Sequence, residues 1–476
     1  MYKRSILLLI FIASVLVSCS DSQSVNESDI SVMAITGATL FDGNANETIE
    51  NSIVVIQDDR LSCVGTEENC DIPGGAEVVD ASGKFITPGM VDAHMHFFQT
   101  GFFDSRPDAM DITDIYPFTE VAAYQEQHPE RYYDSYVCSG VTAVYDVGGM
   151  TRSIGLEETA ESNPMAPHVA AAGPLLTPVP GAPFDLPSDR VLVQLDSEET
   201  GVKMVQYVSA LGSTGVKFWQ LDEDNPDYMG YVEAAADEIE RRGNQMIAHA
   251  TTLDQAKAAL RNGTKLLVHS VSDVEVDDEF IQLAIENETI YNPTLIVRDG
   301  YNDAYRAAAG IDPIEIKDPN DCVDQKTREL ITSADQFLDH PLFDNETFLE
   351  RLEQAADPQT RQDASFIDYL NLRKVHQAGI PIAVGTDAGN PGTLHGISIF
   401  DELEAMQTAG ISADDLIVAS TRNGAMAMQR LDDFGTLEAG KFANLLILDE
   451  DPSQDISNMR TLSSVMIKGS FYNPDK

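Results

Sequence analysis

A repeated alternation of short apolar strands with helices, from about residue 88 to 430, constrains this chain more than any other feature. "SGVTAVYDVGG" and "STGVKFWQL" are runs rich in branched apolar residues, a composition typical of strands. The alanine-rich stretch from Tyr228 to Arg242 is typical of a helix, and "TLDQAKAALRNG" predicts a second helix that ends at Gly263. Alternation over this length predicts an α/β fold with a parallel sheet, most simply a (β/α)8 TIM barrel.

The segments on either side of residues 88–430 have a different rhythm. Residues 31–87 contain short strands bounded by Gly, Asp or Asn, and the same pattern returns at residues 431–474. We therefore predict a small β-sandwich domain built from both chain ends, with the barrel inserted between them. Within the barrel, the acidic stretch at 298–363 is either an extended helix after the seventh strand or a lid insertion.

The first nineteen residues resemble the signal peptide of a bacterial lipoprotein. A basic start precedes an apolar run, residues 6–17, that is short for a transmembrane helix. The run ends in "LVSC", which resembles a lipobox, so Cys19 is expected to carry the lipid that anchors the protein to a membrane. The serine after it favours the outer membrane of a Gram-negative cell envelope, and residues 20–30 are expected to form a polar tether. The alternative is an ordinary secreted protein.

Four cysteines remain after Cys19. Cys63 and Cys70 flank a turn-rich segment, and both a disulfide and two separate thiols are compatible with that spacing. Cys138 and Cys322 are predicted to be single buried thiols.

The chain is strongly acidic. It has 78 Asp and Glu residues against 30 Lys and Arg, a formal net charge of −48. Such a surface repels phosphates, so nucleic acid is not an expected partner. A hydrophobic content of 43% is sufficient for a large core. The sequence leaves the oligomeric state open, a homo-oligomer included.

His94 and His96 lie two residues apart in "VDAHMHF", near the start of the alternating region. Alternate residues of a strand point to the same side, so both imidazoles face one way. The carboxyl ends of barrel strands carry the active site, and imidazole is a common ligand of zinc and similar ions. The pair predicts metal ligands only weakly by itself, because two strand histidines can also be packing residues.

Four residues far downstream strengthen the metal hypothesis. His249 and His269 each end an apolar run and are one strand–helix unit apart, and Asp387 ends "IPIAVGTDAG". Lys217 lies inside an apolar strand, where a free ammonium is costly. A carboxylated lysine would instead be an anion able to bridge two metals. The alternatives are packing for the histidines, a helix N-cap for Asp387 and a rim ion pair for Lys217.

At this point a family resemblance emerges. "FITPGMVDAHMHF", the lysine of "GVKFWQ", the two strand-end histidines, "VGTDAG" and "GTLEAGKFANLLILDEDP" resemble the amidohydrolase superfamily over residues 32–470. Within the superfamily, the chain is most similar to the imidazolonepropionase-like branch that includes Xaa-Pro dipeptidases (prolidases).

The resemblance implies a binuclear hydrolase. His94, His96 and Asp387 are then expected to hold one divalent metal ion and His249 and His269 another, with Zn²⁺ the expected ion. Lys217, carboxylated by CO2, is expected to bridge the two metals together with a hydroxide. Asp387 is the expected general base and then acid, which moves a proton from the nucleophile to the leaving amine.

Three further residues are predicted to bind the substrate. Arg298 is placed to hold a carboxylate, Tyr228 to donate to a carbonyl oxygen and His395 to line the pocket. The alternatives are an Arg298 ion pair with Asp299 or Asp303, core packing for Tyr228 and a loop or cap role for His395.

The substrate itself is less constrained than the centre. The first hypothesis is hydrolysis of C–N bonds in short peptides or N-acyl amino acids, as an Xaa-Pro dipeptidase does. The second is an esterase, a lactonase or a cyclic-amide hydrolase on the same site. The third is a non-catalytic, lipid-anchored binding protein, against which the complete ligand set argues.

Overall fold

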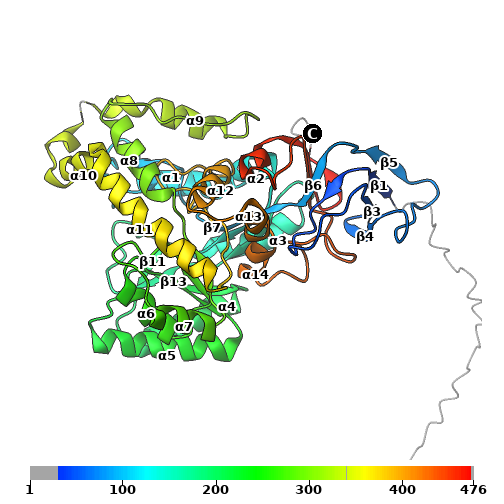
Figure 1. The fold of residues 1–476 in the computed structure, drawn as a ribbon. Coiled ribbons are helices and arrows are strands. Elements are labelled where there is room, and N and C mark those ends of the chain that lie inside the picture. The colour runs from blue at the N-terminus through cyan, green and yellow to red at the C-terminus, as the bar shows by residue number, and fades with distance from the viewer. Residues whose placement is uncertain (1–30, 339, 473–476) are drawn as a thin grey trace, which may run out of the picture.

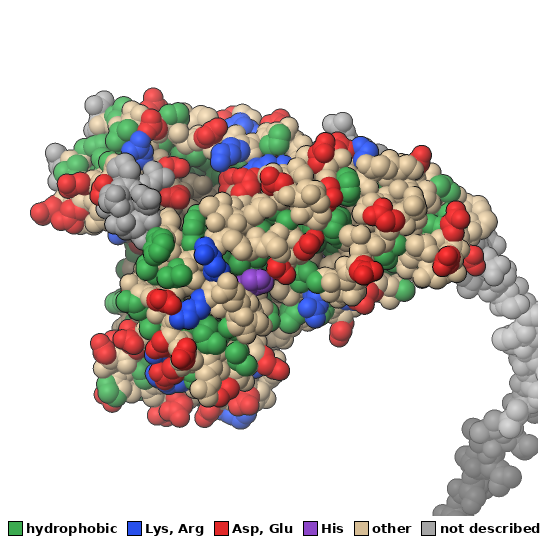
Figure 2. All heavy atoms as spheres, in the orientation of Figure 1, with side chains coloured by type: hydrophobic (Ala, Val, Ile, Leu, Met, Phe, Trp, Pro, Cys, Tyr) green, Lys and Arg blue, Asp and Glu red, His purple; other side chains and the backbone are tan. Residues whose placement is uncertain are grey.

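The computed structural model describes residues 31–338 and 340–472 (Figure 1). The predicted signal peptide, its Cys19 and the tether of residues 20–30 lie outside the described residues. Within the described ranges, none of the helices is both long enough and apolar enough to cross a bilayer. Acidic side chains are spread over the face seen in Figure 2, as the charge of −48 leads one to expect.

The chain ends form two mixed sheets, drawn on the right of Figure 1, the first from N-terminal strands alone and the second from strands of both ends. The first has the order β4-β3-β1-β5, with strands Arg60–Gly65, Ile53–Gln57, Val32–Thr36 and Glu77–Asp80. The second has the order β18-β17-β16-β6-β2, with strands Ser470–Phe471, Leu462–Ile467, Leu445–Leu448, Phe85–Pro88 and Thr39–Leu40. The two ends meet where β16 pairs antiparallel with β6, and one apolar cluster contains residues of both sheets.

The middle of the chain forms two sheets in which the strands pair in parallel. The larger has the order β11-β10-β12-β13-β14-β15, with strands Leu192–Gln194, Leu175–Thr177, Gly215–Phe218, Gln245–His249, Leu266–Val268 and Ile290–Asn292. The smaller has the order β7-β8-β9, with strands Met90–Met95, Val141–Asp146 and His168–Ala171. These parallel strands confirm the predicted α/β class.

One extended segment, residues 381–388, lies between β15 and β7. The Ala383 N–H donates to the carbonyl of Tyr291 in β15 at 3.0 Å, and the Ala93 N–H of β7 donates to the carbonyl of Val384 at 3.0 Å. Among the described residues of this region, the paired strands fall into two parallel sheets, and this segment is hydrogen-bonded to one strand of each.

Helices accompany the parallel strands, and one of them begins and ends at residues typical of helix caps. In α5, Pro226–Arg242, the Asn225 side chain accepts a hydrogen bond from the Tyr228 N–H, and Gly243 ends the helix at φ +73°. The predicted helix from Tyr228 to Arg242 is confirmed and begins two residues earlier. The other helices that accompany the strands are α2 Glu130–Cys138, α3 Leu156–Glu161, α4 Glu198–Ala210, α6 Leu253–Arg261, α7 Asp278–Glu286, α11 Pro358–Gln377, α12 Ser398–Thr408, α13 Ala413–Ser420 and α14 Arg422–Ala427.

The acidic stretch after β15 forms a helical lobe, at the upper left of Figure 1. It contains α8 Val297–Ala308, α9 Gln325–Thr332 and α10 Glu346–Ala356. Its apolar cluster includes Phe103 and Phe337, so the lobe packs on the segment that follows β7. That segment leads into α1, Phe118–Gln127. Short 3-10 turns complete the described elements: Phe103–Ser105, Thr151–Gly155, Ala334–Phe337, Pro341–Asp344 and Ile456–Arg460.

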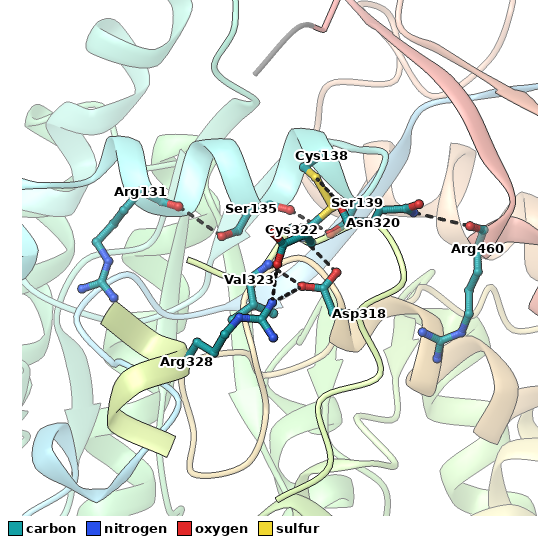
Figure 3. The surroundings of a disulfide bond; sticks show 11 residues. Arg131, Ser135, Cys138, Ser139, Asp318, Asn320, Cys322, Val323, Arg328 and Arg460 are labelled. Atoms are coloured by element: carbon teal, nitrogen blue, oxygen red, sulfur yellow. Dashed lines mark hydrogen bonds and ion pairs between the residues drawn. A yellow bond between two sulfur atoms is a disulfide. The ribbon is translucent and has the colours of Figure 1, made fainter. Parts of the chain in front are cut away.

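The four cysteines of the described residues are disulfide-bonded in two pairs. Cys63 and Cys70, for which the sequence left a bridge and separate thiols open, are bonded, with an S–S distance of 2.20 Å. The prediction of single thiols at Cys138 and Cys322 is wrong, because they too are bonded, at 2.01 Å. Figure 3 shows this second bridge between the end of α2 and the loop before α9. The two cysteines are 184 residues apart, so only the packing of the lobe against α2 brings them together.

Candidate metal centre

Six of the residues predicted to bind metal line one cavity of about 300 Å³: His94, His96, Lys217, His249, His269 and Asp387. They come from the carboxyl ends of β7, β12, β13 and β14 and from the segment between β15 and β7. Because parallel strands all end at one edge, residues scattered over almost 300 positions of sequence converge there.

Asp387 lies between the two histidines of the His-x-His pair. Its Oδ1 is 2.9 Å from Nε2 of His96 and 3.3 Å from Nε2 of His94. The backbone repeats the contact, since the Asp387 N–H donates to the carbonyl of His94 at 2.6 Å. The first predicted ligand group is therefore assembled in space.

The other two histidines lie beside this group. The ring centroids of His249 and His269 are 4.4 Å apart, and those of His94 and His269 are 5.0 Å apart. Ligand atoms of His94, His269 and Asp387 all lie within 4.8 Å of one another. The two predicted ligand groups are thus adjacent, with His269 close to both.

Hydrogen bonds to the far side of two rings orient them toward the cavity. Nδ1 of His96 lies 2.5 Å from the carbonyl of Gly148 and donates to it, so Nε2 faces Asp387. Nδ1 of His269 lies 2.7 Å from the hydroxyl of Thr294. Such contacts fix the ring and leave the other nitrogen as the ligand atom.

The backbone at the centre has unusual conformations. His269 and Asp387 have φ of +73° and +56°, in the left-handed region that side chains other than Gly and Asn rarely adopt. Gly385 is needed because a Cβ there would lie 2.2 Å from Nδ2 of Asn292 and 2.7 Å from Cβ of His94. Outliers that cluster at one edge are typical of functional sites.

The electrostatics of the centre favour a neutral imidazole at three of the four histidines. Burial lowers the pKa of His94 and His249 well below the usual value, and that of His269 to about 4. Burial acts the same way on His96, but hydrogen bonds to Asp146 and Asp387 outweigh it and raise its pKa to about 9. Burial raises the pKa of Asp387, yet its interactions with His94 and His96 reverse this and leave it well below the usual range. Neutral imidazole and ionised carboxylate are the forms that bind metals.

Lys217 is 1% exposed and lines the same cavity from β12, while Val216 and Phe218 on either side of it belong to the apolar core. Burial lowers the pKa of Lys217 to about 7. A large fraction of the amine is then uncharged near neutral pH, the form that reacts with CO2.

The donor set fits a divalent metal ion. Both ring nitrogens of His94 are buried and lack a hydrogen-bonding partner among the described residues. Buried polar atoms without partners are costly in free energy, and ligation of a cation would satisfy Nε2, the nitrogen that faces Asp387. Imidazole and carboxylate donors together suit zinc and neighbouring first-row ions.

Of the three residues predicted to bind the substrate, one lines the cavity and two do not. Arg298 lines the cavity and forms an ion pair with Asp368, at 2.7 Å. Tyr228 is buried in the apolar core and does not line the cavity. His395 also lies outside the lining, stacked on Tyr132 with ring centroids 3.8 Å apart, and its Nε2 donates to the carbonyl of His96 at 3.1 Å. Because Tyr228 and His395 lie outside the cavity lining, the structure gives no support for substrate contacts by either residue.

Several residues that line the cavity or lie beside it were not predicted from the sequence. Arg106 donates to both carboxylate oxygens of Asp108, at 2.8 Å and 2.7 Å, and also to Oδ1 of Asn390. Asn390 in turn donates to the carbonyl of Asp387 at 3.0 Å. Asp146 ends β8 beside His96, with 3.7 Å between its Oδ1 and Nδ1 of that ring. Asp146 alone had a usable signal, because it ends an apolar strand as Asp387 does.

Comparison with known proteins places this geometry in context. A family model described as "Amidohydrolase family" matches residues 85–471. An imidazolonepropionase of Geobacillus sp. (strain WCH70) is 26% identical over 436 residues, 85% of this chain and 85% of that protein. A dihydroorotase of Pelotomaculum thermopropionicum is 32% identical over 150 residues, and the match spans 34% of its length and 29% of this chain. A solved structure of a Xaa-Pro dipeptidase with bound methionine has a TM-score of 0.66 at 21% identity, over 93% of this chain and 100% of that one.

Proposed function

The chain belongs to the amidohydrolase family, and from that premise we propose that it is a binuclear metal-dependent hydrolase of amide C–N bonds in short peptides or N-acyl amino acids. One observation carries the proposal: His94, His96, His249, His269, Asp387 and Lys217 converge on a single cavity. The fold shared with a Xaa-Pro dipeptidase makes dipeptides the first substrates to test.

His94, His96 and Asp387 would hold one metal and His249 and His269 the other, with Lys217 between them as its carbamate. When bound, such ions supply Lewis acidity and lower the pKa of water. Asp387 is ionised in this site, the form in which its Oδ1 can accept a proton from the attacking water. The same oxygen then gives the proton to the leaving nitrogen, which departs as an amine.

The cavity walls have their own part in this reaction. The Asn390 side chain, donating to the carbonyl of Asp387, restrains the loop that carries the proton-transfer group. The hydrogen bond from Nδ1 of His96 to the carbonyl of Gly148 keeps Nε2 of that ring directed at Asp387. Catalytic carboxylates need such restraint, because misplacement by about 1 Å can cost a factor on the order of 10² in rate.

The architecture belongs to the same proposal. We propose that residues 88–430 form a (β/α)8 barrel and that residues 31–87 and 431–474 form a β-sandwich. Support comes from the segment at 381–388, which hydrogen-bonds both parallel sheets, and from the apolar cluster common to both mixed sheets. We also propose that Cys19 carries a lipid anchor in the envelope of a Gram-negative cell, on the strength of its sequence context alone.

A substrate panel tests the proposed reaction. The metal-loaded chain is assayed with Xaa-Pro dipeptides, N-acyl amino acids, neutral esters, lactones and cyclic amides. We expect cleavage of linear amides with release of a free amine. Turnover of esters or lactones alone would contradict the amide assignment.

A further inference from the structure

One side of the cavity is apolar. Its lining comes from the loop after His96, from β10 and β11 with the segment between them, and from the residue after β12: Phe98, Leu175, Phe184, Val191, Leu192 and Trp219. These residues belong to one apolar cluster, in which the rings of Phe98 and Phe184 meet edge to face with centroids 6.1 Å apart. Phe118 supports Phe184 from behind, at 5.5 Å, and does not line the cavity.

This apolar side begins directly at the candidate metal ligands. The ring of Phe98 lies 5.8 Å from that of His96, and the ring of Trp219 lies 6.3 Å from that of His249. A substrate with its scissile carbonyl at the centre would therefore place one of its two substituents against these rings.

The other charged lining residues are already paired. Arg106 is held by Asp108, as described above, and Tyr301 and Arg106 both donate to Oδ1 of Asn390, next to Asp387. Arg298 contacts Asp368. Each arginine of the lining is thus paired with a carboxylate, whereas the six residues of the apolar side carry no charge.

We propose that the apolar side formed by these six residues is a subsite for an uncharged apolar substituent of the substrate, either a phenyl ring or an alkyl chain. The proposal rests on the proposed amide hydrolysis and narrows it to amides with one apolar and one polar substituent. The reason is the hydrophobic effect, because apolar groups gain free energy against this wall while an ammonium or carboxylate loses its hydration there. Free dipeptides with small or charged side chains are then poor substrates.

Two matched substrate series test the subsite on the full metal-loaded chain. The first lengthens the acyl group of N-acylglycines from acetyl to butyryl, hexanoyl and phenylacetyl. The second lengthens the amine of N-alkyl acetamides over the same steps. We expect kcat/KM to rise about fourfold for each buried methylene in one series. A flat response in both series overturns the subsite, whereas failure to cleave any amide overturns the proposed function instead.

Binding to the apolar subsite can be measured separately from amide hydrolysis. Tryptophan fluorescence reports on it, because Trp219 is the only tryptophan of the chain. We expect benzyl alcohol to change the fluorescence saturably and ethanol to leave it unchanged, whether or not any substrate is cleaved. Phe184→Ala and Leu192→Ala should each weaken this binding at least fivefold and flatten the responsive series. Phe280→Leu, a buried change on α7 outside the cavity, is the control and should do neither. A non-saturating signal, or equal loss in the control, would contradict the subsite.

Discussion

Oδ1 of Asp387 lies 2.9 Å from Nε2 of His96, and this contact joins the bridging segment between the two parallel sheets to the end of β7. Both residues are buried, at 5% and 6% exposure. A charged carboxylate persists in such a place only with close partners, and two histidines supply them.

Replacing Asp387 by Asn should remove proton transfer while leaving the shape of the centre nearly unchanged. We expect kcat to fall by a factor on the order of 10² to 10⁴, with KM little altered. Metal content and melting temperature are measured alongside, so that loss of proton transfer is distinguished from loss of ions. Full turnover in a variant that keeps both metals would refute the general-base role.

Lys217→Ala should remove the proposed bridge. The variant is expected to bind fewer than two ions per chain and to lose turnover, since no anion remains between the two ligand groups. Added propionate should restore part of both by placing a carboxylate in the space vacated. Unchanged stoichiometry and turnover without propionate would mean that Lys217 is a structural lysine.

Glu402 of α12 predicts a pH dependence of stability away from the centre. It is fully buried and accepts hydrogen bonds from the N–H groups of Leu295 and Ile296, at 2.9 Å and 3.1 Å. Burial outweighs these bonds and raises its pKa to about 8. Because the folded-state pKa lies above that of the unfolded chain, its contribution to stability is complete below about 4.5 and is lost as the pH rises through about 8.

The check is the free energy of unfolding of the native chain and of Glu402→Gln at several pH values. The native chain should lose stability relative to the variant between pH 5 and 9, since Gln stays uncharged throughout. A constant difference between the two proteins over that range would show that Glu402 does not titrate abnormally.

The two disulfides provide a matched pair for a stability experiment. Cys138–Cys322 closes 184 residues and Cys63–Cys70 closes 7. Chain-entropy arguments give about 5 kcal/mol for the long loop and about 2 kcal/mol for the short one. Double serine variants of each pair, compared by urea unfolding, should reflect that order. The long-loop variant should also release the helical lobe to protease, and equal losses in both variants would contradict this account.

The strand and helix pattern of this fold and the six candidate metal ligands could be predicted from the sequence because they depend on local patterns. The period-two spacing of His94 and His96 and the apolar runs that end in His249 and Asp387 are readable one strand at a time. Parallel strands then carry those ends to one edge, so that no knowledge of long-range packing was needed.

What the sequence did not reveal depends on contacts between distant segments. Cys138 is bonded to Cys322 only because the lobe packs on α2. Arg298 forms its ion pair with Asp368 on α11, 70 residues away in the sequence. His395 ends a similar-looking loop, yet stacking on Tyr132 turns it away from the cavity. Arg106, which lines the cavity and is paired with Asp108, lies in a turn, where no strand pattern in the sequence indicates such a position.

The most direct test of the central claim is the metal content of the purified chain, measured together with its amide hydrolysis before and after chelation. We predict two divalent ions per chain, loss of turnover when they are removed, and recovery with added Zn²⁺ in proportion to the ions regained. Undiminished amide hydrolysis by the metal-free chain would contradict the account.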